Sequence, residues 1–278
     1  MIEELLLSTS VRCERQRGSY EQDEKRMTRI LMHGCNGKMG RMITELVKND
    51  DSAVITAGVD TYTGIPNDYP VFETVSQCDV EADVVIDFSN AGAMDELLDY
   101  CAEKKLPVVL CTTGLSAEQL EKVEKTSEKT AVLKSANMSL GINLLLKLLK
   151  DAAKVLGNAG YDIELVERHH NQKLDAPSGT ALALADSINE ALDGAYHYVY
   201  DRSQVRQKRD GREIGISAVR GGTIVGEHEV IFAGTDEVIE FKHTAYSRNV
   251  FAKGAVEAAK FLKDREPGMY DMGDVIQF

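Results

Sequence analysis

Between residues 28 and 134 the chain alternates, with little interruption, between short apolar runs and segments whose apolar side chains recur every three or four positions. The first pattern is typical of buried strands and the second of amphipathic helices. Uniformly apolar strands that alternate with such helices indicate a parallel sheet covered on both faces. The sequence therefore predicts a doubly wound, Rossmann-like α/β domain. Its predicted strands are residues 28–34, 53–59, 82–88, 107–111 and 130–134, and its predicted helices are residues 39–47, 94–101 and 116–128.

The pattern changes in the second half of the chain. A helix predicted at residues 140–156 is apolar around much of its surface, so we expect it to be buried between layers. Later, three strands follow one another with short glycine-containing turns between them, which predicts consecutive hairpins and an antiparallel or mixed sheet. The further predicted elements are the strand 162–168, the helix 179–192 and the strands 213–220, 223–233 and 237–243.

These two patterns predict two domains and an extension. The α/β domain covers residues 27–134 plus 247–278, because a helix predicted at residues 247–263 is expected to return to it. Residues 135–246 form a second, α+β domain built on a mixed sheet. Residues 1–26 are charged and lack a sustained period, so we expect an extension outside the fold, to which we assign no function. The alternative for its start is a short frayed helix at residues 2–7.

The N-terminal region also bears on location. The apolar run at residues 5–7 follows Glu3 and Glu4, where a secretion signal would be basic. The sequence has no apolar run near the ~18 residues that span a bilayer. We therefore expect a cytoplasmic chain with no membrane partner.

Composition narrows the classes of ligand. The chain has 32 Lys and Arg residues against 45 Asp and Glu residues, a formal net charge of −13, which argues against nucleic acid because such binding relies on basic side chains. A small anion stays compatible, provided that a local basic pocket receives it. The five cysteines are odd in number and include no C-x-x-C pair, so neither a disulfide framework nor a zinc site is predicted. They are Cys13, Cys35, Cys78, Cys101 and Cys111.

The turn after the first predicted strand has the pattern G-x-x-G-x-x-G at residues 34–40. Glycines let the chain turn sharply and bring backbone N–H groups close to a pyrophosphate, while the positive N-terminus of the next helix faces the same anion. The usual pattern is G-x-G-x-x-G, and a glycine-rich turn without a ligand is the alternative. The candidate cofactor contacts here are Gly34, Cys35, Asn36, Gly37, Lys38 and Met39.

An acidic residue ends the second predicted strand. Asp60 lies about twenty residues beyond the glycine turn, where a ribose-binding acid belongs in dinucleotide sites. A carboxylate there accepts hydrogen bonds from the adenosine ribose and repels a 2′-phosphate, which favours NADH. Thr61 cannot neutralise that phosphate, whereas Lys38 is able to do so in part, so the use of NADPH stays open. The alternative is a solvated carboxylate at a strand end.

Two further strand ends fall on the same edge of the predicted sheet, where open parallel sheets bind their ligands. The fourth predicted strand ends in Cys111, Thr112 and Thr113, whose hydroxyl groups suit the carboxamide of a nicotinamide. A simple turn with no ligand role fits this spacing equally well. The fifth strand runs into another loop of small residues, namely Ser135, Ala136, Asn137 and Met138.

The densest group of reactive side chains lies in residues 167–180. His169, His170 and Lys173 fall within five positions and are able to donate protons or hold anions. Paired histidines also fit a metal site, but no third ligand is evident and the segment beginning at His228 lacks the second histidine of H-E-x-x-H. No metal is therefore predicted, and a structural histidine pair is the remaining alternative.

A serine in the same segment fits helix capping better than nucleophilic catalysis. Ser178 lies in A-P-S-G-T rather than G-x-S-x-G, and it immediately precedes the helix predicted at residues 179–192. As the cap, it leaves the N–H groups of Gly179 and Thr180 pointing out of a positive helix end, where a carboxylate binds favourably. With Lys173 nearby, the segment predicts a pocket for an anionic substrate beside a histidine acid or base.

This segment, E-R-H-H-x-x-K-x-D-A-P-S-G-T at residues 167–180, resembles that of the 4-hydroxy-tetrahydrodipicolinate reductases, also called dihydrodipicolinate reductases. The similarity extends from about residue 27 to the C-terminus. The other matching motifs, in order, are G-x-x-G-x-M-G at 34–40, V-I-D-F-S at 85–89, T-T-G at 112–114, A-N-M-S at 136–139, V-R-G-G-T-I-V-G-E-H at 219–228 and S-R at 247–248.

The resemblance implies an enzyme of lysine and diaminopimelate biosynthesis. Members of the family reduce the cyclic product of aspartate semialdehyde and pyruvate to tetrahydrodipicolinate, using NADH or NADPH, with loss of water. A hydride passes from the nicotinamide to the conjugated carbon of the ring, and an acid completes the addition. The resemblance also implies a homotetramer formed through the sheet of the second domain, and a domain closure that brings the nicotinamide to the substrate.

The resemblance further implies a role for each matching residue. His169 corresponds to the proton donor and acceptor, and Lys173 to a second proton donor. The residues that correspond to the dicarboxylate site are His170, Gly179 and Thr180. Those that correspond to cofactor contacts are residues 34–39, Asp60, and residues 111–113 and 135–138.

Two features depart from the family pattern. Cys111 stands where glycine is common, so the backbone near the nicotinamide is expected to shift slightly with activity retained, and residues 1–26 have no counterpart. Two rival hypotheses stay open. One is another amino-acid-pathway dehydrogenase on the same first domain, which residues 167–180 disfavour. The other is a nicotinamide-binding sensor without turnover, which the presence of both His169 and Lys173 disfavours.

Overall fold

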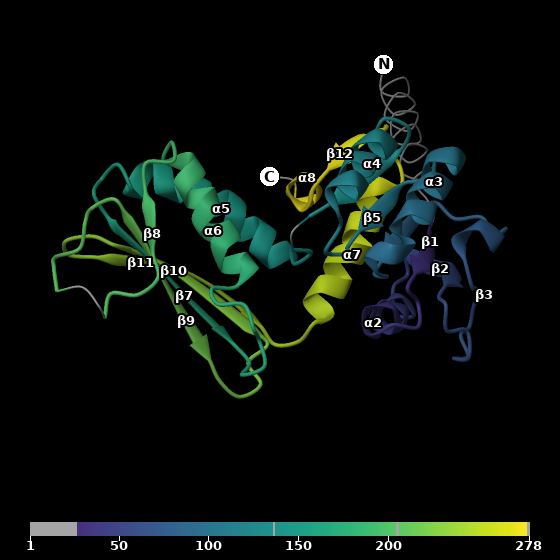
Figure 1. Cartoon of the computed structure of the whole chain (residues 1–278), viewed down its shortest axis with the longest axis horizontal. Coiled ribbons are helices and arrows are strands. Elements are labelled where there is room, and N and C mark those ends of the chain that lie inside the picture. The colour runs from purple at the N-terminus through teal and green to yellow at the C-terminus, as the bar shows by residue number, and fades with distance from the viewer. Residues whose placement is uncertain (1–26, 136, 204–205, 277–278) are drawn as a thin grey trace, which may run out of the picture.

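The computed structural model describes residues 27–135, 137–203 and 206–276, so the extension and the short helix predicted within residues 1–26 lie outside the described residues. Figure 1 shows two bodies side by side, each built on a sheet of its own. The larger sheet has the order β12-β6-β5-β4-β1-β2-β3, and all of its pairings are parallel. Its strands are β1 (Thr28–His33), β2 (Ala53–Val59), β3 (Val71–Phe72), β4 (Val84–Asp87), β5 (Val108–Leu110), β6 (Ala131–Lys134) and β12 (Gly268–Tyr270).

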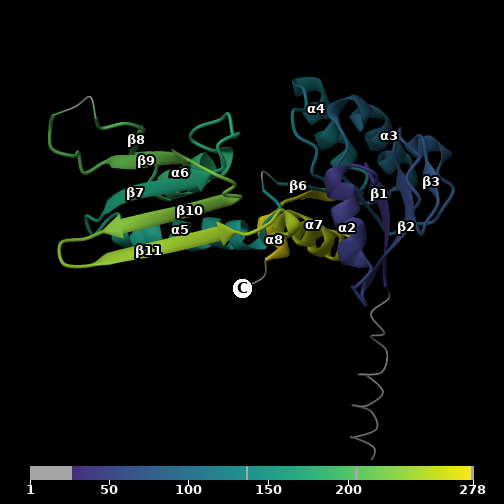
Figure 2. The same ribbon diagram turned by 90° about the horizontal axis from the view of Figure 1, so that it is seen from below.

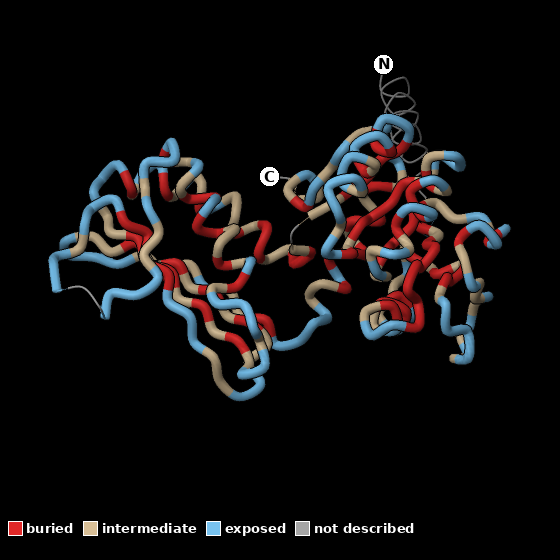
Figure 3. The backbone as a smooth tube through the Cα atoms, in the orientation of Figure 1, coloured by how far each residue is buried: buried red, intermediate tan, exposed pale blue. Residues whose placement is uncertain are grey.

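Helices cover both faces of the seven-stranded sheet. Successive side chains of a strand point to opposite faces, so Met32 of β1 enters the core beneath one pair of helices and Leu31 the core beneath the other. The residues of both cores are buried, as Figure 3 shows by the red tube through the sheet. The predicted doubly wound parallel sheet is confirmed. The helices are α2 (Lys38–Val47) and α7 (Asn249–Leu262) on one face, and α3 (Met94–Lys104) and α4 (Ala117–Ser127) on the other.

The second sheet is mixed, as predicted, and has the order β11-β10-β7-β9-β8. Its central strand, β7, pairs parallel with β9 and antiparallel with β10. Two helices, α5 and α6, pack on one face around Leu149, Leu184 and Phe232, and Figure 2 shows them behind the sheet. The elements are α5 (Leu140–Leu156), β7 (Asp162–His169), α6 (Gly179–Ala191), β8 (His197–Val199), β9 (Glu213–Arg220), β10 (Gly226–Ala233) and β11 (Val238–Ala245).

Two predictions for the second half of the chain were wrong. Strands β9 and β10 follow one another closely in sequence but do not pair, because β7 lies between them, so only β10 and β11 form a hairpin. Helix α5 is also not buried between layers. It shares one face of the sheet with α6, and its other side is open to solvent, where Leu148 is 39% and Val155 is 68% exposed.

Several short elements were not predicted, because segments of two to four residues are too short to show a period. The strands β3, β8 and β12 each lie at an edge of a sheet. The others are the 3-10 turns η1 (Val75–Gln77) and η2 (Ala91–Ala93) and the final helix α8 (Met272–Val275). Within the described ranges, no helix has the length and apolar character needed to cross a membrane.

Helix α7 returns to the first sheet, as predicted, and passes closely over the segment that links the two bodies. A Cβ added to Gly254 would lie 1.6 Å from the carbonyl oxygen of Met138. On the other side of this link, the Asn143 side chain donates hydrogen bonds to the carbonyl oxygens of Asn137 and Ser139, at 2.7 and 2.8 Å. The link is therefore held from both bodies.

Candidate active site

A cavity of about 600 Å³ lies at the carboxyl ends of β1, β2 and β4. This is the edge at which open parallel sheets bind nucleotides. Three carboxylates line the cavity, whereas no lysine or arginine is among its lining residues. Its lining includes, in chain order, Gly34, Gly37, Asp60, Glu73, Ser89 and Glu96.

The glycine turn is shaped by positions at which no side chain fits. Gly34 has a φ of +80°, and a Cβ there would lie 2.6 Å from the carbonyl oxygen of Phe88. A Cβ at Gly40 would lie 2.2 Å from the carbonyl oxygen of Gly34. Gly37 precedes α2 without a side-chain cap, and the first turn of α2 contains no acidic residue. Its first N–H groups are therefore available to an anion, which fits the pyrophosphate of a dinucleotide.

Asp60 and the glycine turn form one hydrogen-bonded unit. The Asp60 carboxylate accepts a hydrogen bond from the backbone N–H of Asn36 at 2.9 Å and another from that of Tyr62 at 3.0 Å. The Asn36 side chain donates in turn to the carbonyl oxygen of Tyr62 at 2.6 Å. Each carboxylate oxygen keeps a second lone pair, so Asp60 is held at the cavity and remains able to accept from ribose hydroxyls.

The other predicted residues of the turn face elsewhere. The Cys35 thiol is buried against Gly58, and burial raises its pKa to about 12, so only the Cys35 backbone is available to a ligand. Lys38 and Met39 line a separate cavity of about 870 Å³, together with Arg248 at the start of α7. Lys38 is absent from the lining of the cavity beside Asp60, so its predicted neutralisation of a 2′-phosphate gains no support from the structure.

The segment after β5 is tied to the neighbouring strand ends. The fully buried Asp87 carboxylate, at the end of β4, is 2.8 Å from Nδ1 of His33, and the Asp87 carbonyl oxygen accepts from the N–H of Cys111 at 3.0 Å. Burial raises the pKa of Asp87, but hydrogen bonds led by that of His33 outweigh it and hold the pKa below its ordinary value. Thr112 is buried and Thr113 is exposed, so Thr113 is the better placed of the two threonines for a ligand.

The segment after β6 reaches the second body. The Asn137 side chain donates a hydrogen bond to the hydroxyl oxygen of Thr180 at 3.0 Å. Ser135 lies beside it and donates to the Asn137 carbonyl oxygen at 3.2 Å, while Met138 is buried. Ala136 lies outside the described residues. A predicted cofactor residue and a predicted substrate residue are thus in direct contact.

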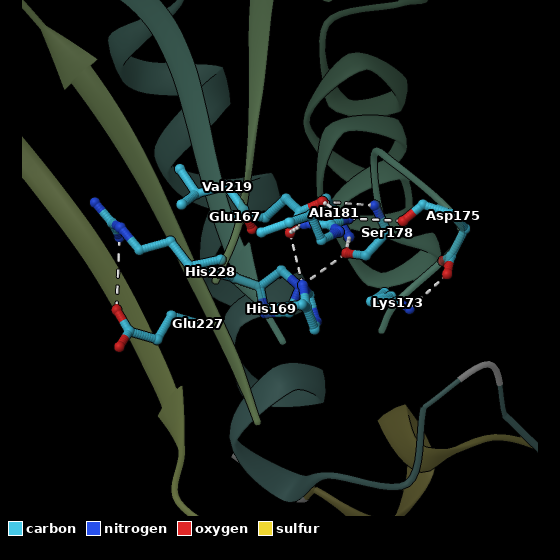
Figure 4. Close-up of polar contacts among 11 residues, drawn as sticks. Glu167, His169, Lys173, Asp175, Ser178, Ala181, Val219, Glu227 and His228 are labelled. Carbon is cyan, nitrogen blue, oxygen red and sulfur yellow. Dashed lines mark hydrogen bonds and ion pairs between the residues drawn. The ribbon is translucent and has the colours of Figure 1, made fainter. Parts of the chain in front are cut away.

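Strand β7 ends in the histidine that the sequence predicts as the acid or base. His169 is 8% exposed, and its Nδ1 lies 2.6 Å from Oε2 of Glu167, which is on the same face of the strand (Figure 4). Because a carboxylate only accepts, Nδ1 carries a proton. The other nitrogen, Nε2, faces Gly226, where a Cβ would lie 3.1 Å away. The His228 ring meets the His169 ring edge-on, with centroids 5.2 Å apart.

Glu167 is a buried carboxylate with several donors. Besides His169, it accepts hydrogen bonds from both terminal nitrogens of Arg220 at 2.7 Å and from the backbone N–H of Ser178 at 3.0 Å. Burial raises the pKa of Glu167, but the hydrogen bonds from Arg220, His169 and Ser178 prevail and lower it. The carboxyl group is therefore ionised at neutral pH.

The start of α6 and the preceding loop hold the remaining predicted residues. The Ser178 hydroxyl accepts from the N–H of Ala181 at 3.2 Å, so the predicted helix cap is confirmed. Lys173 forms an ion pair with Asp175 at 2.8 Å, which lowers the pKa of Asp175. Gly179 is exposed at the helix start. Figure 4 shows Lys173, Asp175 and Ser178 on the same side of β7 as His169. His170 directly follows β7 and is half-buried.

Burial of His228 is expected to make the stability of the protein depend on pH. Burial and the neighbouring His169 lower its pKa to about 3, against about 6.5 for an ordinary histidine. Between these values the unfolded chain binds more protons than the folded chain, so the free energy of unfolding falls as the pH drops from 6.5. At pH 5 the expected loss from this group is about 2 kcal/mol.

Urea unfolding at pH 7 and pH 5 measures this loss. His228→Gln should lose less stability than the wild type between the two pH values, whatever its stability at pH 7. His197→Gln, which changes an exposed histidine of β8, is the matched control and should follow the wild type. An equal loss in wild type and His228→Gln would contradict the prediction.

Three residues of this site had no role in the sequence-based prediction: Glu167, Arg220 and His228. Glu167 lies two positions before His169, and the period of two in a strand was a usable signal that both face the same side. Arg220 and His228 come from strands on either side of β7, and no local pattern indicates that pairing. Among the described residues, no cluster of three His, Cys, Asp or Glu side chains is arranged to hold a metal.

Comparison with known proteins identifies the family of this chain. The family model for the N-terminus of dihydrodipicolinate reductase matches residues 28–138, and that for the C-terminus matches residues 141–276. The chain belongs to the dihydrodipicolinate reductase family. It is an oxidoreductase family of lysine and diaminopimelate biosynthesis, whose N-terminal Rossmann domain binds the nicotinamide cofactor. Another dehydrogenase of amino-acid metabolism is thereby excluded.

Individual dihydrodipicolinate reductases match over nearly the whole chain. The 4-hydroxy-tetrahydrodipicolinate reductase of Caldanaerobacter subterraneus is 53% identical over 251 residues, which is 90% of this chain and 99% of the relative. That of Clostridium novyi is 51% identical over the same shares of both chains. A dipicolinate-bound dihydrodipicolinate reductase from Paenisporosarcina sp. TG-14 has a similar structure, with a TM-score of 0.75 and 25% identity, covering 90% of this chain and all of the other.

Proposed function

We propose that this chain reduces 4-hydroxy-tetrahydrodipicolinate to tetrahydrodipicolinate with NAD(P)H and loss of water, using His169 and Lys173 for proton transfer. The observation that carries this proposal is the hydrogen bond from Asn137 to Thr180, because it joins the edge of the nucleotide sheet to the helix start beside His169. Hydride transfer needs such proximity, since reacting atoms must approach to about 3–3.5 Å.

The residues of the chain supply binding and protons. Bound NAD(P)H supplies the hydride. The N–H groups of Gly179 and Thr180, at the positive start of α6, receive one carboxylate of the substrate, and His170 assists. Nε2 of His169 makes no hydrogen bond within the described part of the chain, so it is the nitrogen that exchanges a proton with the substrate. The ammonium group of Lys173 is the second proton donor. It leaves its ion pair with Asp175 when the substrate binds.

The substrate class follows the same reasoning. The relative from Paenisporosarcina binds dipicolinate, a flat dicarboxylate. In this chain Lys173 and the start of α6 offer positive charge within an acidic protein of formal net charge −13. These local positive charges therefore favour binding of a dianion at this position, although the protein as a whole is negatively charged.

A coupled assay tests the function. Purified synthase generates the unstable substrate from aspartate semialdehyde and pyruvate, and NADH consumption is followed by absorbance. Steady consumption that depends on both synthase substrates supports the reductase. NADH binding without consumption would instead identify a sensor and refute the proposal.

We also propose that NADH is the preferred cofactor. Asp60, Glu73 and Glu96 line the cavity, and a 2′-phosphate would meet their negative field with no lysine or arginine in the lining to offset it. Asp60→Ala is expected to lower the ratio of kcat/KM for NADH to that for NADPH about tenfold, since one hydrogen-bonded charge is worth roughly 1.5–3 kcal/mol.

Steady-state rates with both cofactors measure that ratio. Asp68→Ala is a suitable control, because Asp68 is an exposed carboxylate that does not line this cavity. An unchanged ratio in Asp60→Ala would remove Asp60 from the ribose site.

The remaining proposals concern organisation. Residues 27–134 plus 247–278 form the dinucleotide-binding domain, and residues 135–246 form the substrate-binding and oligomerisation domain. The chain assembles as a homotetramer through the second sheet and acts in the cytoplasm. Light scattering of the purified chain, with a subunit mass of 30.6 kDa, measures the number of subunits directly.

A further inference from the structure

A single carboxylate lies beneath the proposed acid, and four N–H donors converge on its two oxygens. Oε2 of Glu167 accepts hydrogen bonds from Nδ1 of His169 and from one terminal nitrogen of Arg220. Oε1 accepts hydrogen bonds from the other terminal nitrogen of Arg220 and from the backbone N–H of Ser178. Glu167 has no exposed surface, so solvent competes with none of these bonds.

This arrangement depends on the order of strands in the second sheet. Because β7 lies between β9 and β10, Arg220 of β9 reaches the carboxylate from one side while His228 of β10 meets the His169 ring from the other. The backbone pairing of His169 with Arg220 places the two residues directly across β7 and β9. The Glu167 side chain is thereby held between two neighbours with fixed backbones.

The negative charge of Glu167 is offset by the positive charge of Arg220. A carboxylate alone beneath the imidazole would favour the charged ring and hold its proton tightly. The guanidinium of Arg220 forms a bidentate pair with the same carboxylate, which offsets that field and also fixes the carboxylate in one orientation. The ring is therefore oriented by a hydrogen bond to a carboxylate whose negative charge the guanidinium offsets.

We propose that Glu167 and Arg220 are a pair of positioning residues that hold Nδ1 of His169, direct Nε2 toward the substrate, and set how readily Nε2 gives up its proton. The proposal deepens the proposed function and rests on His169 being the acid. Neither Glu167 nor Arg220 touches the substrate or the cofactor in this role.

Other charged groups face His169 and must be held constant in any test. From β10, His228 lies edge-on to the ring, and burial keeps it neutral. From the loop after β7, Lys173 is engaged with Asp175. At the cap of α6, the Ser178 hydroxyl lies 3.1 Å from Nε2 of His228 and does not titrate in the accessible range. Substitutions at 167 and 220 change none of these side chains chemically, but Arg220 also donates to the carbonyl oxygen of Asp175 at 2.6 Å, so the Lys173–Asp175 pair needs its own control.

The two members of the pair predict opposite pH shifts. Glu167→Gln removes the negative charge beside the imidazole, so the limb of the pH profile of kcat/KM governed by His169 should move to lower pH, by about one unit or more. Arg220→Gln leaves the carboxylate uncompensated, so the same limb should move to higher pH. Each variant should also lower kcat about tenfold or more, since the ring loses its fixed orientation.

Glu167→Gln cannot reproduce the wild-type hydrogen bonds. Whichever way its amide is turned, an NH2 group meets two donors. Glu167→Asp keeps the charge and should return the limb to its wild-type position even if kcat stays low. If Arg220→Gln fails to fold, comparing the pH profiles of Glu167→Gln and Glu167→Asp still tests whether the charge at position 167 sets the limb. Glu81→Gln is the matched control, because Glu81 pairs with Arg29 at 2.8 Å in the first body, away from the second sheet.

The outcomes separate this proposal from the proposed function. Loss of kcat in both variants without opposite movement of the limb would mean a merely structural role and would overturn the inference. Full activity in His169→Gln would overturn the proposed function itself, whatever the other variants do. The dissociation constant of NADH, measured by fluorescence, should stay unchanged in all of them.

Discussion

His169→Gln and Lys173→Ala are each expected to lower kcat by at least about a hundredfold, the usual contribution of a positioned acid or base. Glutamine keeps the size and polarity of the imidazole but cannot transfer a proton near neutral pH. Alanine at position 173 removes the ammonium group, which lies 2.8 Å from the carboxylate of Asp175. Steady-state kinetics in the coupled assay measure the loss.

Cofactor binding should be unaffected in both variants, because His169 and Lys173 belong to the second body, whereas the glycine turn belongs to the first. Fluorescence titration should give NADH dissociation constants within about twofold of the wild type, less than the 1.4 kcal/mol that a tenfold change requires. His197→Gln and Lys129→Ala alter exposed side chains elsewhere and serve as controls. A large loss of NADH affinity with normal turnover would contradict the assignment.

Gly254→Ala is expected to destabilise the protein by about 2–3 kcal/mol, the upper part of the range for overpacking. The added Cβ would lie 1.6 Å from the carbonyl oxygen of Met138, and a backbone atom cannot move aside as a flexible side chain does. Alanine favours a helix over glycine by about 1 kcal/mol. A net loss of stability would therefore mean that the steric clash costs more than this gain in helix propensity.

The same substitution should reduce activity in whatever fraction stays folded. Met138 belongs to the segment that carries Asn137, whose side chain reaches Thr180. Urea unfolding and kcat in the coupled assay are the measurements. Lys253→Ala, the exposed neighbour on α7, is the control and should leave both values near those of the wild type. A Gly254→Ala protein as stable as the wild type would show that α7 and the link are able to separate at little cost.

The first sheet was largely predictable from sequence, because each of its central strands is apolar on both sides. A helix of clear period separates each strand from the next, except between β2 and β4. Such local patterns also placed the glycine turn and Asp60, which the structure joins by the hydrogen bond from Asn36. The order of strands in the second sheet was not predictable. Hydrophobic alternation tells which face of β9 is buried, but not that β7 lies between β9 and β10.

The same limit applied to the site. His169, Lys173 and Ser178 lie close together in sequence, so a short segment was enough to predict an acid beside a helix start. Arg220 reaches Glu167 from 53 residues away, and this contact exists only because β9 pairs with β7. The steric demand at Gly254 likewise depends on where α7 crosses the link, which its own sequence does not reveal.

The place of α7 and β12 has a consequence for synthesis. Both come from the last thirty or so residues, yet α7 supplies Ala252, Ala255 and Val256 to the core under β1 and β4, and β12 completes the edge beside β6. A growing polypeptide therefore leaves the ribosome with one face of its first sheet covered by α2 alone until α7 has emerged. Messages that end early should yield products that aggregate or are degraded, and chaperone dependence should fall once residue 262 has emerged.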